Sequence, residues 1–210
     1  MNYRVVVLAA ICLFSVVAAF AQDDGPFQVR YVANLGIGDS FINITNTGAS
    51  STVALPVQNG NICANVYAFS PDERLASCCS CLITPNGLAS LSVINDILSN
   101  TLTSQRPTSL VVKLLGSAGT TSASCNAATV GTGTNLLTTG MAAWATTIHA
   151  LPVSAGMTHA YSFSETPFTN ATLSAAELVR ITTLCAFNQI SGGGQGICAS
   201  CRLGGREPTK

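Results

Sequence analysis

The chain has 210 residues, of which 9% are charged, and its 9 Lys and Arg residues balance 9 Asp and Glu residues. Ordinary soluble domains carry about 25% charged residues. This composition excludes a basic patch for nucleic acid and a polybasic stretch for anionic lipid. A surface of hydroxyls, amides and small side chains also lacks the charge that keeps monomers apart, so we expect a homo-oligomer.

Residues 1–21 predict a secretory signal peptide. A basic start precedes an unbroken apolar run, and Ala19-Phe20-Ala21 offers small residues at the −3 and −1 positions, so we expect cleavage between Ala21 and Gln22. An uncleaved membrane anchor is the first alternative, because the run is almost long enough to span a bilayer. A lipoprotein on Cys12 is the second, and the bulky residue before that cysteine disfavours it. The mature protein is expected to be secreted, outside the cell or on its surface.

The mature chain opens with a predicted strand within residues 22–36. Its apolar side chains alternate with mostly polar ones and form one face: Phe27, Val29, Tyr31, Ala33 and Leu35. The strand can complete its own sheet, or it can pair with the sheet of a neighbouring copy. The segment is similar, in pattern only, to the donor strands of chaperone–usher pilins, and this implies head-to-tail growth into an open filament.

Further short strands follow, separated by turn residues. We expect them within residues 39–48, 51–57, 61–70, 75–84, 88–94, 109–117 and 140–152, with a loop-rich stretch at 118–140. The segment 109–117 is apolar on both faces and is predicted to be central in a sheet. One helix is predicted after the capping box Ser174–Glu177, with Leu178, Ile181 and Cys185 on one stripe and glycines 192–194 as the stop.

These elements predict a mainly β fold. We expect an antiparallel β-sandwich, Ig-like or pilin-like, with a body at 37–172 and a helix and cysteine-containing tail at 173–210.

Eight cysteines remain once the signal peptide is removed, and an even number in an exported chain predicts disulfides. They are Cys63, Cys78, Cys79, Cys81, Cys125, Cys185, Cys198 and Cys201. Metal binding by the clustered cysteines, and redox catalysis by the C-x-x-C pair near the C-terminus, are the alternatives, and both are disfavoured by the compartment or the context.

Neighbouring cysteines on a strand point to opposite faces, so Cys78 and Cys79 are expected to reach different elements. If residues 62–69 and 75–83 form a hairpin with Phe69 facing Leu75, then Cys63 lies opposite Cys81. We therefore predict a Cys63–Cys81 bridge, while the other pairings stay open.

The sequence carries no catalytic signature, so we expect no enzyme, no cofactor and no metal. Gly38-Asp39-Ser40 resembles the first block of secreted GDS-type esterases, but neither His149 nor His159 has the Asp three residues earlier that these enzymes use. Asn43 and Asn170 begin glycosylation sequons. A single Trp in a strand, Trp144, is more typical of a core than of a sugar platform.

Three segments carry a resemblance over nearly all the mature chain: residues 61–102, 140–152 and 185–205. In these the chain resembles an uncharacterised family of exported, cysteine-rich β proteins from acidobacteria, which implies a secreted β protein and no activity. We expect an extracellular structural subunit that forms fibres by N-terminal strand exchange. The alternative is a monomeric secreted domain that binds carbohydrate or another surface ligand.

Overall fold

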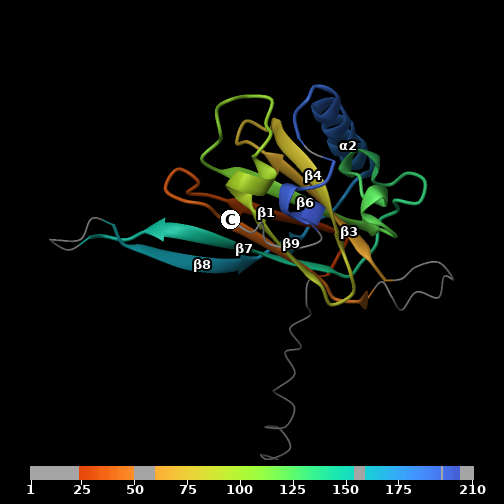
Figure 1. Ribbon diagram of the computed structural model, residues 1–210, viewed down its shortest axis with the longest axis horizontal. Coiled ribbons are helices and arrows are strands. Elements are labelled where there is room, and N and C mark those ends of the chain that lie inside the picture. Colours follow the sequence, from red (N-terminus) through yellow and green to blue (C-terminus); the bar gives the residue numbers. More distant parts are fainter. Residues whose placement is uncertain (1–23, 50–59, 154–158, 195, 204–210) are drawn as a thin grey trace, which may run out of the picture.

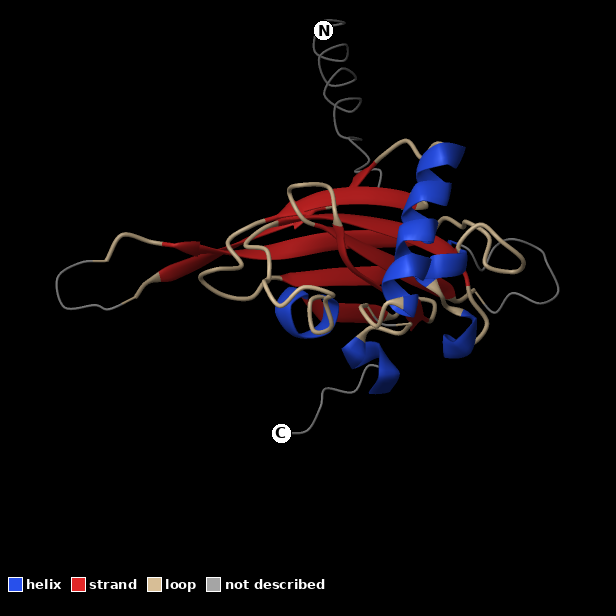
Figure 2. Ribbon diagram, turned by 90° about the horizontal axis from the view of Figure 1, so that it is seen from above, coloured by secondary structure: helices blue, strands red, loops and turns tan. Residues whose placement is uncertain are grey.

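The structure, a computed structural model, describes residues 24–49, 60–153, 159–194 and 196–203. The predicted signal peptide and the predicted strand at 51–57 lie outside these residues. The described chain forms two antiparallel sheets packed face to face, with one α-helix near the C-terminus (Figures 1 and 2). The predicted mainly β fold with a C-terminal helix is confirmed.

Sheet A has five strands in the order β4-β3-β6-β1-β9. Their bounds are β1 (Phe27–Val32), β3 (Ile62–Phe69), β4 (Leu75–Ile83), β6 (Leu110–Ala118) and β9 (Thr169–Asn170). The strand β6 pairs with β3 on one side and β1 on the other, so its predicted central place is confirmed.

Sheet B has four strands in the order β5-β2-β7-β8. Their bounds are β2 (Phe41–Asn46), β5 (Leu88–Ser92), β7 (Met141–Ala150) and β8 (Tyr161–Pro167). Neither β8 nor β9 was predicted from the sequence. Phe168 joins these two strands, is buried, and donates its backbone N–H to Ala143 O at 2.8 Å, where the chain crosses from sheet B to sheet A.

Sheet A is buried on both faces, as β3 shows most clearly. Alternate residues such as Val66 face sheet B and join the core between the sheets, whereas Tyr67 faces away from it. All eight residues of β3 are nevertheless buried, because α2 (Ala175–Ile190) and the stretch between β6 and β7 form a third layer over the outer face of sheet A. The Tyr67 hydroxyl donates to Ala127 O in that layer at 2.6 Å, and burial raises the pKa of this tyrosine.

The helix α2 forms as its sequence predicts. The Ser174 hydroxyl accepts the Glu177 N–H at 3.1 Å, Ile181 and Cys185 are fully buried, and Gly192 takes a positive φ of 85° just after the C-terminal end.

Glu177 ties α2 to sheet A electrostatically. Its carboxylate accepts hydrogen bonds from Lys113 of β6 and from Arg180 of its own helix. Partial burial acts to raise the pKa of Glu177, but the hydrogen bonds and charges of Lys113 and Arg180 outweigh it and hold this pKa below its ordinary value. The Lys113 ammonium also lies 4.9 Å from the centre of the Phe69 ring, so the pair is packed against an aromatic surface.

The lowered pKa of Glu177 predicts acid-dependent stability. A carboxylate with a depressed folded-state pKa contributes stability above its unfolded pKa, about 4.3, and loses it as pH falls through the folded value. We expect the substitution Glu177→Gln to lower the free energy of unfolding at pH 7 and to flatten its fall between about pH 5 and pH 3. Denaturant titrations across this range measure both effects. The control is Glu73→Gln in an exposed turn, which should follow the wild type; equal curves for all three proteins would contradict the prediction.

Candidate functional site

Four disulfides join the eight cysteines of the described chain, and three of them meet on β4. They are Cys78–Cys185, Cys79–Cys198, Cys81–Cys201 and Cys63–Cys125, with Cα–Cα distances of 5.8, 4.9, 5.5 and 5.3 Å. Cys78 faces outward and holds α2, whereas Cys79 and Cys81 face the core and hold the C-terminal tail. The prediction that neighbouring cysteines reach different elements is confirmed.

The tail also closes the edge of β4 through its backbone. Ser80 N–H donates to Gly196 O at 3.2 Å, and Cys198 N–H donates to Ser80 O at 3.1 Å, so Ile197 forms a parallel bridge beside β4. Ser200 N–H donates to Asp96 Oδ1 at 3.0 Å. Hydrogen bonds and disulfides therefore fix the tail along an edge that would otherwise be open to another strand.

The predicted Cys63–Cys81 bridge is wrong, and a β-bulge is the reason. Phe69 does face Leu75, but the register shifts by one between Ala68 and Phe69, so Cys63 lies opposite Leu82 and Cys81 lies opposite Ala64. A shift of one residue sends a side chain to the other face of a sheet. Cys63 consequently points outward and pairs with Cys125.

The four disulfides bond all eight cysteines of the described chain, so none of these sulfur atoms is a free thiol that could bind a metal or take part in a redox reaction. Cys198 and Cys201 are bonded to β4 and not to each other. Within the described residues, no three His, Cys, Asp or Glu side chains gather in an arrangement that could hold a metal ion. The clustered cysteines are thus crosslinks, which are typical of proteins that fold in oxidising compartments.

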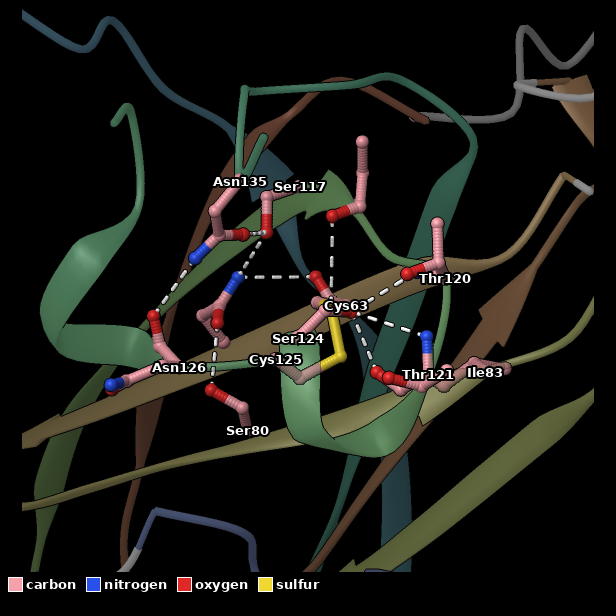
Figure 3. The surroundings of a disulfide bond; sticks show 12 residues. Cys63, Ser80, Ile83, Ser117, Thr120, Thr121, Ser124, Cys125, Asn126 and Asn135 are labelled. Atoms are coloured by element: carbon pink, nitrogen blue, oxygen red, sulfur yellow. Dashed lines mark hydrogen bonds between the residues drawn. A yellow bond between two sulfur atoms is a disulfide. The ribbon is translucent and has the colours of Figure 1, made fainter. Parts of the chain in front are cut away.

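A buried polar network surrounds the Cys63–Cys125 disulfide (Figure 3). Asn65 Nδ2 donates to Ser117 Oγ at 2.8 Å, and Ser80 Oγ donates to Asn65 Oδ1 at 2.7 Å, so the network links β3, β4 and β6. Ser117 Oγ in turn donates to Asn135, which donates to Asn126 O at 3.0 Å in the loop beside Cys125. The loop between β6 and β7 is therefore held by hydrogen bonds as well as by a disulfide.

Gly119 lets that loop leave β6 close to the bridge. A Cβ at this position would lie 2.6 Å from Cys63 Sγ, closer than real Cβ atoms approach, so glycine is required.

The predicted assembly strand lies in the chain's own sheet. β1 pairs with β6 from Phe27↔Leu115 to Val32↔Leu110, and with β9 at Gln28 and Val29. Of the five residues predicted to form one apolar face, Phe27 is buried and Val29 half-buried under the outer layer, while Tyr31 is 56% exposed. Ala33 and Leu35 follow the strand. The core between the sheets instead receives Val32, and Gln28 of the same face donates to Met141 O.

The residues of the esterase-like block have structural roles. Asp39 accepts the N–H groups of Ser40 and Ile94 at 2.8 and 3.0 Å, and it also accepts the Ser92 hydroxyl. It thereby fixes the π-helical turn η2 (Val93–Ile97) to the segment just before the start of β2. Ser40 is fully buried and out of reach of a substrate.

His149 contacts a serine that the sequence did not single out. His149 Nε2 lies 2.7 Å from Ser164 Oγ, which is the spacing of a base and a nucleophile. The Asn34 amide nitrogen donates to Ile148 O at 2.8 Å and lies 3.5 Å from His149 Nδ1. Each ring nitrogen of His149 therefore has one polar neighbour, and the tautomer of the ring decides which of these groups donates.

The expectation that Trp144 is a core residue is wrong. Ala143 and Ala145 point into the core, so Trp144 lies on the outer face of sheet B and is partly exposed. The sequon residue Asn43 is its cross-strand neighbour there and is half-buried, whereas Asn170 is exposed on β9.

Comparisons with protein-family models, curated proteins and solved structures find no match for this chain. The resemblance to exported acidobacterial proteins therefore stays a prediction. Among the described residues, no helix has the length and apolar character needed to cross a membrane.

The disulfide pattern can be checked directly. Peptide mapping by mass spectrometry without reduction should recover the four pairs above, including Cys63–Cys125 and no Cys63–Cys81.

Loss of a disulfide should lower the free energy of unfolding by several kcal/mol, because closing a loop of 62 to 120 residues stabilises a protein by about 4–5 kcal/mol in the chain-entropy model. We expect the double substitution Cys81→Ser with Cys201→Ser to leave three bridges and a lower unfolding midpoint; an unchanged midpoint, or another pairing in the wild type, would refute this assignment.

Proposed function

We propose that this protein is an exported structural subunit that assembles head-to-tail by exchange of β1 between copies. The observation that carries the proposal is where the crosslinks lie. All four bridges involve residues from Cys63 onward, and residues 24–49, which contain β1 and β2, hold no cysteine. β3 and β4 are covalently tied to the outer layer through Cys63–Cys125 and Cys78–Cys185, whereas β1 can leave without a covalent bond being broken.

The place that β1 occupies has the form of a slot. One side is β6, which pairs with β1 over all six of its residues, and the other side is the two-residue strand β9. The slot accepts Val32 toward sheet B and Phe27 toward α2. An identical strand from another copy would make the same ladder and fill the same pockets, so exchange conserves most of the binding energy.

The connection from β1 to β2 gives exchange its hinge. Residues 33–40 contain two glycines, and Asn34 takes a positive φ of 65°. Exchange of β1 has to break contacts that hold this connection to its own body, among them Leu35 N–H to Thr108 O at 3.0 Å and the Asn34 amide to Ile148 O at 2.8 Å. A straightened hinge would carry β1 away from its own body, and a contact of this head-to-tail kind need not close into a ring.

A second candidate function, binding of a carbohydrate by the monomer, is supported by the outer face of sheet B. Phe41 and Phe163 are exposed there and Trp144 is partly exposed. Between them Thr146 Oγ1 donates to Glu165 Oε1 at 3.3 Å, so polar groups lie beside the aromatic rings. Rings that stack on sugars beside hydrogen-bonding groups are typical of such surfaces.

Disulfide trapping tests strand exchange. Tyr31 of β1 lies opposite Val111 of β6, and neither side chain is buried. We expect the double variant Tyr31→Cys with Val111→Cys, oxidised after assembly, to form a ladder of covalent multimers on a non-reducing denaturing gel, because the two new cysteines then belong to different copies.

The matched control is Thr45→Cys with Leu88→Cys, which joins β2 to β5 across sheet B and should crosslink within one chain. Electron micrographs of the wild type should show filaments. If the Tyr31/Val111 variant crosslinks within single chains although the protein assembles, strand exchange is refuted.

A further inference from the structure

The sheet edges of this fold are not equally protected. The tail covers β4, β9 has only two residues, and β5 is a short strand that ends at η2, where its last N–H, from Ser92, is accepted by Asp96. β8 is the edge of sheet B on the other side, and it is seven residues long. Within the described part of the chain, no strand lies along its outer side. Natural sheets shorten, charge or cover such edges, because an open edge pairs with other strands.

The hydrogen bonds at the two ends of β8 fix which groups point outward. Leu151 N–H donates to Ala160 O at 2.8 Å, and Phe168 N–H donates to Ala143 O at 2.8 Å. Bonding alternates along an antiparallel strand, so the even-numbered residues of β8 bond to β7. The odd-numbered residues Tyr161, Phe163 and Glu165 therefore direct their backbone N–H and C=O groups away from β7.

Half of the β7–β8 ribbon extends beyond the rest of sheet B, as both views show (Figures 1 and 2). The pairing of β2 with β7 ends at Phe41↔Thr146, whereas β7 and β8 continue to pair as far as Ala150↔Tyr161. A two-stranded ribbon is only marginally stable in water by itself. This one also presents Phe163 at 68% exposure and Tyr161 at 43%.

We infer that β8 is a second self-association surface, at which two copies pair their β8 strands antiparallel about a two-fold axis and join their four-stranded sheets into one. The register follows from the outward-directed residues. With the axis at Phe163, this residue faces Phe163 of the second copy, and Tyr161 of each copy faces Glu165 of the other. Cross-strand aromatic pairs stabilise a sheet, and this register keeps the two Glu165 carboxylates apart.

A second copy fits this edge better than a charged partner does. β8 carries one charged residue, Glu165, and the edge has none of the lysines that commonly block pairing. The chain has a formal net charge of +0, and loss of the predicted signal peptide removes only one charged side chain, Arg4, so two copies carry almost no net charge and repel each other little. The contact is isologous and closes on itself, in contrast to the head-to-tail exchange of β1, so the two together would link filaments side by side. The β8 contact does not depend on the proposed exchange of β1.

Charge substitutions at Phe163 test both the surface and the register. Phe163→Lys and Phe163→Glu each place like charges opposite one another, so each variant alone should associate at least about 10-fold more weakly than the wild type in sedimentation velocity. A 1:1 mixture of the two should regain the dimer, because Lys then faces Glu. The control is Phe187→Lys on α2, whose side chain is 65% exposed; it should associate like the wild type.

These measurements use as the parent the single-chain form of the Tyr31→Cys, Val111→Cys protein, oxidised in dilute solution and separated from any covalent multimers. Its crosslink holds β1 in its own sheet and blocks exchange, whereas the β8 dimer should still form and should still respond to Phe163. A parent that is monomeric at about 100 μM, well above the Kd range of a specific interface, would overturn the β8 proposal. So would variants that dimerise as strongly as the parent, or a mixture of the Lys and Glu variants that stays monomeric.

Discussion

The covalent attachment of β4 to two separate segments, through three disulfides, is the constraint on which the rest of this structure depends. Cys78 reaches α2 on one face, while Cys79 and Cys81 reach the tail from the other. Such long loops lose much of their freedom in the unfolded chain when they are closed. With 9% charged residues and a single ion-paired cluster joining α2 to sheet A, the described chain relies on crosslinks and buried contacts more than on electrostatics.

The crosslinks divide the molecule into a tied part and an untied part. The tied part comprises β3, β4, the loop at Cys125, α2 and the tail. The strands without a cysteine include β1 and β2, which precede the first bridge, and β7 and β8, which lie between Cys125 and Cys185; β5, β6 and β9 also hold none. Both proposed contacts between copies use untied strands. A crosslinked body that keeps one strand free to exchange (β1) and one free to pair at a sheet edge (β8) suits a subunit that assembles with other copies.

Much of the fold could be predicted, because alternation and capping are local signals. The capping box at Ser174 and the two-sided apolar pattern of β6 predicted their elements correctly. The bridge from Cys63 could not be predicted, because one bulge at Ala68 shifts the register and places Cys63 on the opposite face of the sheet from Cys81. No residue pattern in the sequence marks this bulge. β8 was overlooked although Tyr161 and Phe163 alternate with serines, a weak form of the same signal. The contact between His149 and Ser164 depends on sheet register, which only the fold supplies.

The most direct test of the account is to compare guanidinium unfolding of the oxidised protein with that of the protein held in reductant. If the bridges from β4 secure the outer layer, the oxidised chain unfolds cooperatively at high denaturant and yields no reactive thiols while folded. The reduced chain should lose its cooperative transition or show it at a much lower midpoint. Coincident transitions, or several alkylated cysteines in the folded, untreated protein, would contradict the account.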